Sequence, residues 1–350
     1  MCIRDRLQRA KNIYLLYNTE NDHYGSGEQS RFITELEIKK SNEIDSYVVS
    51  PKVNPQNVEL KNIIKSKTVI DRLHELASKG LSPTSLTHYI NNPISFYQEK
   101  ILGIKELEEA EETIAANTLG TIIHKTLESF YTPFKDAYLN KDDILAMKKK
   151  IKNEVLKWFT KVYKNGDINT GKNLLIYNVA QQFISNFLDQ EMKLLGQCSQ
   201  LKIWELEYDL ESELAIEELA MTVKLIGQAD RIDELDGTIR IIDYKTGKVS
   251  QNDLNVKDWN IITKDYKYSK GFQVLFYALM YGKMNGVDFD SQPVESGIIS
   301  FKNLNSGFLK INRNTISNQD LGNFTVELKR LISEIFDPKI PFIENENKYY

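Results

Sequence analysis

The chain has 350 residues, which is long enough for two structural units, and a formal net charge of −4. Its apolar residues (41%) and charged residues (27%) have the proportions of an ordinary globular protein. Its two cysteines, Cys2 and Cys198, lie far apart, which argues against a disulfide framework or a zinc site. The sequence contains no apolar run of the roughly 18 residues that a membrane span needs and no signal peptide, so the predicted location is the cytoplasm.

The N-terminal 57 residues alternate between apolar and polar segments. Residues 12–17 (NIYLLY) predict a short buried strand, and residues 29–38 predict an amphipathic helix. Residues 41–57 are polar, contain Pro51 and Pro55, and are typical of a linker. Because this segment is too short to form a core alone, we interpret it as the end of a larger unit.

Helical patterns dominate the segment that follows. Residues 58–81 predict a helical connector, with apolar periodicity from 63 to 76. At the next helix start, Ser82 can cap the first turn and Pro83 suits the first helical position. Further helices are predicted from Asn117, at 141–164 and at 172–195.

Strands are concentrated in the second half of the chain. Alternating or apolar segments predict strands at 202–209, 219–226, 238–245, 297–301 and 308–311, and helices at 271–281 and 321–336. This order predicts a mixed α/β domain with one small sheet. The sequence has no G-x-x-x-x-G-K-[ST] phosphate loop, which excludes an intact nucleotide motor.

Residues 227–245 (GQADRIDELDGTIRIIDYK) predict a β-hairpin. Asp236-Gly237 is the dipeptide that a two-residue type I′ turn prefers, because both central positions need positive φ. With this turn, Asp230 lies directly opposite Asp243, and alternation places Lys245 on the same face. Two carboxylates and one ammonium group therefore converge.

Each face of this hairpin has further predicted pairs. Ile232 faces Ile241 and can form an apolar floor beside the two aspartates. On the other face Asp233 lies opposite Arg240, which predicts a solvated salt bridge. We also expect Arg231 to pair with Asp233.

Opposed like charges destabilise a sheet, and a divalent cation would neutralise them. Carboxylates suit Mg²⁺, and Lys245 can hold a water or a phosphate. The other interpretation is a solvated hairpin face on which Lys245 pairs with both acids. The register alone leaves both interpretations open.

Four segments carry a family resemblance: GTIIH (120–124), GQADRID (227–233), IIDYKTG (241–247) and QVLFY (273–277). In this order and spacing they resemble the PD-(D/E)xK nuclease superfamily and, more narrowly, the RecB/AddB-type exonuclease domain. The resemblance covers about residues 82–340. It implies a nuclease domain at 82–350 with a restriction-endonuclease-like α/β core, a small central mixed sheet flanked by helices, and helical insertions.

The resemblance also implies roles for individual residues. The implied metal ligands are His124, Asp230, Asp243 and the backbone carbonyl of Tyr244. Lys245 is the implied catalytic lysine, and the helix that carries Gln273 and Tyr277 lies against the site, where it contacts DNA or the lysine. The strand before the hairpin often supplies one more acidic residue near the metal, here either Glu205 or Glu207.

The implied function is that of a metal-dependent DNA nuclease, expected to be an exonuclease of recombination and double-strand-break repair that uses Mg²⁺ or Mn²⁺. The alternative is a non-catalytic DNA-binding or scaffold module that retains the nuclease fold. Intact Asp230, Asp243 and Lys245 favour the enzyme. An RNA-directed nuclease is less favoured, since nothing in the sequence indicates recognition of a 2′-hydroxyl.

The resemblance extends to the N-terminus, where NIYLLYNTE followed by GEQSRFITELE resembles the last strand and helix of a helicase-like region. It implies that residues 1–57 are the remnant of that region and that the chain is a fragment of a longer protein. The expected partners are DNA and either a helicase subunit or the helicase region of a longer chain. Many AddB-type nucleases carry an iron–sulfur cluster. Asn92 stands at the position of its first cysteine, and no later cysteines follow Cys198, so no cluster is expected.

Overall fold

The computed structural model describes residues 10–16, 29–39, 44–49, 61–104, 114–163, 170–196 and 200–345. The chain divides into two units, Met1–Val58 and Glu59–Tyr350. Both cysteines and most of the predicted linker lie outside the described residues. All the strands and both hydrophobic cores that the structure describes belong to the second unit.

In the first unit, one of the two predicted elements is present. The predicted helix is confirmed as α2 (Arg31–Lys39), although it buries no side chain. The predicted buried strand at 12–17 is wrong for residues 12–16, which have no regular structure and leave Tyr14 and Leu16 almost fully exposed. A strand needs a neighbour for its backbone hydrogen bonds, and no described segment pairs with these residues.

The second unit is built on a five-stranded sheet with the order β2-β3-β4-β5-β6. Its strands are β2 (Leu201–Ile216), β3 (Met221–Leu235), β4 (Thr238–Lys245), β5 (Val294–Ser300) and β6 (Phe308–Lys310). Only β4 and β5 are parallel, and the helix α9 (Ser269–Asn285) lies in the crossover that a parallel pair needs. The predicted mixed sheet is confirmed. A second, two-stranded ladder of β1 (Asn62–Ile63) and β7 (Phe342–Ile343) was not predicted.

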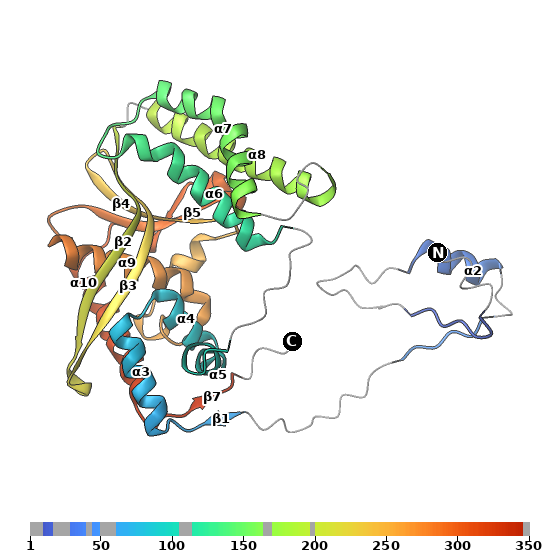
Figure 1. The fold of residues 1–350 in the computed structure, drawn as a ribbon, viewed down its shortest axis with the longest axis horizontal. Coiled ribbons are helices and arrows are strands. Elements are labelled where there is room, and N and C mark those ends of the chain that lie inside the picture. Colours follow the sequence, from blue (N-terminus) through green and yellow to red (C-terminus); the bar gives the residue numbers. More distant parts are fainter. Residues whose placement is uncertain are drawn as a thin grey trace. The chain divides into compact units, whose positions relative to one another are not determined.

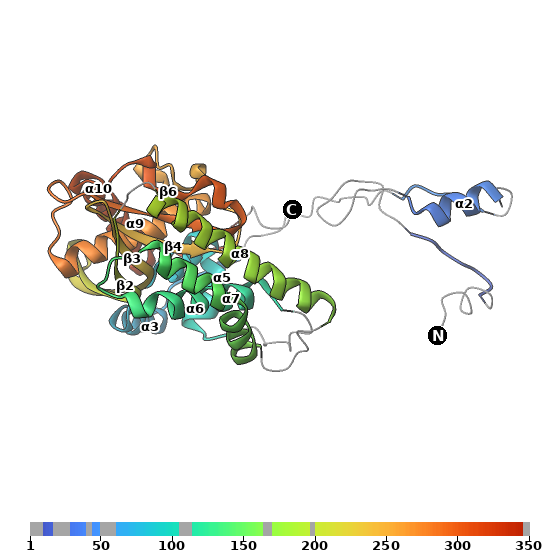
Figure 2. The same ribbon diagram turned by 90° about the horizontal axis from the view of Figure 1, so that it is seen from above.

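Helices cover both faces of the sheet (Figure 1). On one face lie α6 (Ala116–Tyr131), α7 (Lys141–Val162) and α8 (Gly171–Gly196), with α7 and α8 side by side in both views (Figures 1 and 2). The other face packs against α9, α10 (Asn318–Phe336), α3 (Lys67–Lys79), α4 (Pro83–Asn91) and α5 (Pro93–Phe96). Strand alternation divides the cores, since Ile241 belongs to the α9 side and Ile242 to the α6–α8 side.

Short helical turns connect these elements. They are the π turn Tyr97–Ile101 and the 3₁₀ turns Thr132–Phe134, Glu217–Leu219, Gln251–Leu254, Trp259–Ile261, Tyr266–Tyr268, Phe301–Ser306 and Ile311–Arg313. The start predicted for α4 is confirmed, because Ser82 accepts a hydrogen bond from the backbone of Ser85 and Pro83 is the first helical residue. Asn92 caps α5, and its side chain accepts from the backbone N–H groups of Ile94 and Ser95.

The central hairpin follows the predicted register. Asp236 and Gly237 have φ values of +50° and +83°, as a type I′ turn requires. Leu235 pairs with Thr238, and Ile232 pairs with Ile241 in the core. The β3–β4 ladder extends to the pair of Arg231 and Ile242, immediately before Asp230 and Asp243.

The predicted pairing of Asp233 with Arg240 is confirmed, but its predicted solvation is wrong. Arg240 donates to both Asp233 oxygens at 2.6 and 2.8 Å, and Asp233 is fully buried. Arg231 is buried too, with its Nε 2.6 Å from Asp233 and its Nη1 2.7 Å from Glu191 of α8. The guanidinium of Arg231 lies 4.6 Å from the ring of Tyr131 in α6. Helices α6 and α8 cover this face of the hairpin and exclude water from the pair.

Candidate metal centre

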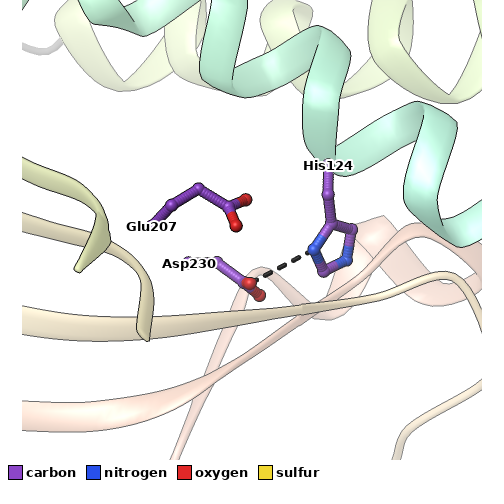
Figure 3. Close-up of side chains that lie close together, drawn as sticks. All are labelled: His124, Glu207 and Asp230. Carbon is purple, nitrogen blue, oxygen red and sulfur yellow. Dashed lines mark ion pairs between the residues drawn. The ribbon is translucent and has the colours of Figure 1, made fainter. Parts of the chain in front are cut away.

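Three side chains from separate elements meet at the edge of α6. His124 comes from α6, Glu207 from β2 and Asp230 from β3, and one ligand atom of each lies within 4.8 Å of the others. Figure 3 shows the two carboxylates and the imidazole directed toward the same space. His124 Nδ1 is 3.1 Å from Asp230 Oδ1, and all three side chains are partly buried. Partial burial leaves the group accessible to a ligand.

An irregularity in β2 brings Glu207 to this position. The register between β2 and β3 shifts by one residue at Trp204. After the shift Leu206 pairs with Arg231 and Tyr208 with Ala229, so Glu207 lies at the level of Asp230. Glu207 has a φ of +45°. Residues other than glycine adopt such an angle rarely and at a cost of about 1 kcal/mol or more. Glu205 instead pairs with Lys135 at 2.7 Å. Of the two glutamates that the sequence left open, the structure therefore places Glu207 beside the histidine.

His124 is held by contacts at both ring nitrogens. Its Nε2 lies 3.1 Å from the backbone carbonyl of Tyr244, and its ring packs edge-on against the Tyr244 ring. Burial lowers the pKa of the imidazole. The carboxylates of Asp230 and Asp243 raise this pKa by a larger amount, so the net pKa lies above its ordinary value. Both nitrogens can donate only in the protonated ring. The positive ring then offsets part of the negative charge of the site, and metal binding would replace one of its protons, because only the neutral imidazole is a ligand.

Asp243 and Lys245 form a pair next to this group. Asp243 is buried, and Lys245 Nζ lies 2.7 and 3.0 Å from its two oxygens. Burial raises the pKa of Asp243, Lys245 opposes this shift, and Asp230 adds to it, with a net rise. Asp230 also accepts a hydrogen bond from the backbone N–H of Tyr244 at 2.5 Å. The two strands are thus tied together where the acids meet.

Burial and negative charge also act on Glu207. Burial raises the pKa of its carboxyl group first, and the nearby carboxylate of Asp230 raises it further. Three acidic side chains therefore lie together with only His124, Lys245 and Lys125 as neighbouring cations, among the residues that the structure describes. A bound cation would lower the electrostatic cost of this arrangement.

Helix α9 supplies the predicted glutamine–tyrosine pair. Gln273 Nε2 donates to the Tyr277 hydroxyl at 2.7 Å. Burial raises the pKa of Tyr277, and the carboxylate of Asp243 contributes to the rise. A Cβ at Gly227 of β3 would lie only 3.0 Å from the Tyr277 ring. Gly227 therefore lets this ring lie against the strand.

The donor set fits a hard divalent cation. It offers one imidazole nitrogen and carboxylate oxygens, which are both common ligands of divalent metals in proteins. Of the ligands implied by the resemblance, the structure brings His124 and Asp230 together with Glu207. It places Asp243 beside them in its pair with Lys245, and the Tyr244 carbonyl against the imidazole.

The ion pair between Glu191 and Arg231, and the burial of Arg231, were not predicted. A glutamate in the middle of a helix and an arginine in a strand give no signal of burial, because both residue types are usually exposed. The Arg231 guanidinium lies 3.5 Å from the Tyr244 hydroxyl, so this buried network contacts the residue whose carbonyl reaches His124.

A mixed sheet flanked by helices, with imidazole and carboxylates at the meeting point of three elements, defines an α/β protein with a candidate metal centre. The family model of the PD-(D/E)XK nuclease superfamily matches residues 80–347, and the chain belongs to this superfamily. The fold is accordingly the predicted restriction-endonuclease-like one. Membership implies a nuclease, and nucleases of this superfamily generally use divalent metals.

The chain is also similar to two uncharacterized proteins from Rickettsia. The protein from Rickettsia conorii (strain ATCC VR-613 / Malish 7) is 26% identical over 179 residues, which are 48% of this chain and 19% of the relative. The protein from Rickettsia typhi (strain ATCC VR-144 / Wilmington) is 27% identical over 209 residues, which are 59% of this chain and 22% of the relative. The chain thus spans about a fifth of the length of these relatives. Among the described residues, no helix has the length and apolar character for crossing a membrane.

Proposed function

We propose that this chain is a divalent-metal-dependent deoxyribonuclease. The observation that carries the proposal is the meeting of His124, Glu207 and Asp230 within 4.8 Å, next to the Asp243–Lys245 pair, in a chain of the PD-(D/E)XK nuclease superfamily. The superfamily supports hydrolysis of phosphodiester bonds.

The residues of the chain have separate proposed tasks. His124, Glu207 and Asp230 would hold Mg²⁺ or Mn²⁺, with Asp243 and the Tyr244 carbonyl as further ligands. When bound, such an ion lowers the pKa of water and stabilises negative charge on a phosphate. The Lys245 ammonium group, which the Asp243 carboxylate holds in place, positions the attacking water or neutralises a phosphate oxygen.

The Gln273–Tyr277 pair is proposed to position the catalytic groups from α9. The hydrogen bond between the two side chains fixes the Tyr277 hydroxyl, and Gly227 allows its ring to lie against β3. We propose that this rigid aromatic side chain lies beside the Asp243–Lys245 pair, which strand alternation places on the α9 side of the sheet together with Ile241. A rigid neighbour restricts the motion of the carboxylate and of the lysine paired with it.

The finer proposal is an exonuclease of the RecB/AddB type that acts in recombination and double-strand-break repair in the cytoplasm. The four motifs in their family order support it. A helicase region of a longer chain, or a helicase subunit, is the proposed partner that supplies DNA ends. The exposed apolar side chains of the first unit and the much greater length of the Rickettsia relatives support this part.

The experiment compares degradation of linear and covalently closed circular DNA by the full chain, in Mg²⁺ and in EDTA. An exonuclease degrades linear DNA in Mg²⁺ and spares the circle. Asp243→Asn and Lys245→Met should each slow degradation by about 10²-fold or more, since each removes charge at the reacting phosphate. Lys329→Met on α10 is the control, because this lysine pairs with Glu217 and is expected to leave the rate unchanged.

Equal degradation by the wild type, Asp243→Asn and Lys245→Met would contradict the proposed function. DNA binding without degradation and without Asp230-dependent Mn²⁺ binding would instead indicate the non-catalytic module. Degradation of closed circular DNA at the same rate as linear DNA would replace the exonuclease by an endonuclease.

A further inference from the structure

A pocket of about 350 Å³ adjoins the candidate metal centre. It lies between the N-terminal half of α6 and the end of β4, and His124 and Glu207 form part of its wall. The remaining wall that the structure describes is formed by Ala116, Asn117, Gly120, Thr121, Lys125 and the segment Tyr244–Thr246. A ligand in this pocket would touch the metal group on one side.

The size and chemistry of the pocket limit its ligand. Its volume is near the lower end of the range of small-molecule sites, roughly 300–1,000 Å³, which suits one small group rather than a duplex. Asn117 offers an amide and Thr246 a hydroxyl group, whereas the Thr121 hydroxyl already donates to the Asn117 carbonyl at 3.1 Å. With the ammonium group of Lys245 beside them, these donors suit an anionic, oxygen-rich ligand such as a sugar and its phosphate.

The described wall provides no surface for stacking a base. Tyr244 is the only aromatic residue among the described lining residues apart from the ring of His124, and it is 3% exposed. Its ring packs against Phe187 and Phe301, on the α8 side of the sheet. Base recognition in single strands relies largely on aromatic stacking. The pocket is therefore suited to the backbone of a nucleic acid and not to its bases.

Gly120 is the residue of the wall with the clearest signature of a functional constraint. A glycine inside a helix is less favourable than alanine, and it is usually explained by a neighbour too close for a Cβ. At Gly120 the nearest atom to such a Cβ would be Thr246 Oγ1 at 3.7 Å, an ordinary contact. Packing therefore does not require glycine here. Its other effect is to leave space in the pocket.

We propose that this pocket is a subsite for the sugar–phosphate of the nucleotide next to the scissile phosphate, bound without regard to its base, and that Gly120 keeps the subsite open. The proposal rests on the proposed nuclease function. It goes beyond that function by assigning a part of the substrate, the deoxyribose–phosphate backbone of one nucleotide, to a defined set of residues outside the metal group.

The test fills the pocket without touching the metal ligands. Gly120→Ala and Gly120→Leu add increasing volume to the pocket, and both residues are strong helix formers. The matched controls are Gly322→Ala and Gly322→Leu in α10, where a Cβ would meet nothing within 4 Å. The full chain and its four variants are compared by steady-state hydrolysis of short single-stranded oligonucleotides in Mg²⁺ and by thermal denaturation.

We expect KM to rise in the order wild type, Gly120→Ala, Gly120→Leu, by roughly tenfold or more for leucine, because one misfitted methylene group can already cost that factor. The rise should be the same for oligo(dT) and oligo(dA), kcat should stay near the wild-type value, and Tm should not fall below it, because both substitutions favour the helix. Both Gly322 variants should match the wild type. An unchanged KM in Gly120→Leu overturns the subsite, and a rise that depends on the base overturns its backbone character.

A second measurement separates this proposal from the nuclease function. Fluorescence anisotropy of a labelled oligo(dT) in EDTA measures binding where metal-dependent cleavage cannot proceed. If the wild type does not cleave DNA but Gly120→Leu weakens oligo(dT) binding relative to Gly322→Leu, the subsite stands and the nuclease function is lost. If the wild type cleaves DNA and Gly120→Leu neither raises KM nor weakens binding, the nuclease function stands and the subsite is lost.

Discussion

Replacement of Asp233 by asparagine tests the buried ion network beneath the hairpin. Asp233 is fully buried and receives contacts from Arg240 at both oxygens and from Arg231 at one of them. Asparagine keeps the shape of the side chain but removes its charge. Arg231 would then keep its pair with Glu191, whereas Arg240 would lose the carboxylate with which it pairs.

The expected loss of stability follows from this geometry. Breaking a buried ion pair by neutralising one partner costs about 3–5 kcal/mol, because the other charge stays buried without compensation. The matched control is Glu217→Gln, which removes an equally short pair with Lys329 at 2.7 Å. Glu217 is exposed, so water and salt screen its pair and the free energy of unfolding should hardly change.

The assay is urea denaturation of the full chain and both variants at neutral and acidic pH. Burial raises the pKa of Asp233, but Arg240 and Arg231 lower it more, so the net pKa in the folded state is depressed. A depressed carboxyl pKa gives stability that is present above the unfolded pKa of about 3.9 and is lost as the pH falls through the folded value. The difference between wild type and Asp233→Asn should therefore be largest near neutrality and shrink in acid. A neutral-pH cost no larger than that of Glu217→Gln would refute this reasoning.

Three further predictions concern the site and the core around it. Glu207→Gln should weaken Mn²⁺ binding by roughly tenfold or more in calorimetric titration, whereas Glu205→Gln should leave it unchanged; equal effects of the two would contradict the placement. Gly227→Ala would force its Cβ against Tyr277, and it should cost about 1–3 kcal/mol in thermal denaturation and slow DNA hydrolysis; wild-type values in both measurements would count against it. Burial lowers the pKa of Lys65 to about 8, so between pH 8 and about 10.5 the unfolded chain binds more protons and the free energy of unfolding should rise with pH. Lys65→Met should lack this rise in urea denaturation. If the free energy of unfolding depends on pH in the same way in the wild type and in Lys65→Met, the prediction is wrong.

The hairpin could be predicted because local rules determine it. The Asp236-Gly237 dipeptide selects the turn, and a two-residue turn sets the register of every pair that follows. For that reason Ile232 and Ile241 were matched correctly from the sequence alone. The same rules place Asp230 and Asp243 at the end of the hairpin, where their strands are joined through the backbone of Tyr244.

The choice of Glu207 over Glu205 could not be predicted in the same way. Simple alternation puts both glutamates on one face of the strand. The choice depends on an extra residue in the ladder at Trp204 and on a positive φ at Glu207, neither of which has a sequence signal here, since neither residue is glycine or asparagine.

Two predictions were wrong because the sequence does not show which segments pack over others: the solvated Asp233–Arg240 pair and the buried strand near the N-terminus. Asp233 and Arg240 were expected in water because charged pairs on a hairpin are usually solvated. Helices α6 and α8 instead cover this face of the sheet, where Tyr131 and Glu191 contact the neighbouring Arg231. The expected strand is absent at residues 12–16 for the opposite reason, because no described segment covers or pairs with these residues. Hydrophobic pattern predicts where a segment can be buried, and the presence of a partner decides whether it is.

The most direct test of the metal centre is a calorimetric Mn²⁺ titration of the wild type, Asp230→Asn and Lys245→Met. Asp230 is within ligand distance of His124 and Glu207, whereas Lys245 is a cation paired with Asp243. We predict that the wild type binds Mn²⁺, that Asp230→Asn binds it at least about tenfold more weakly, and that Lys245→Met retains the affinity. Equal Mn²⁺ affinity in the wild type and Asp230→Asn would contradict the proposed site.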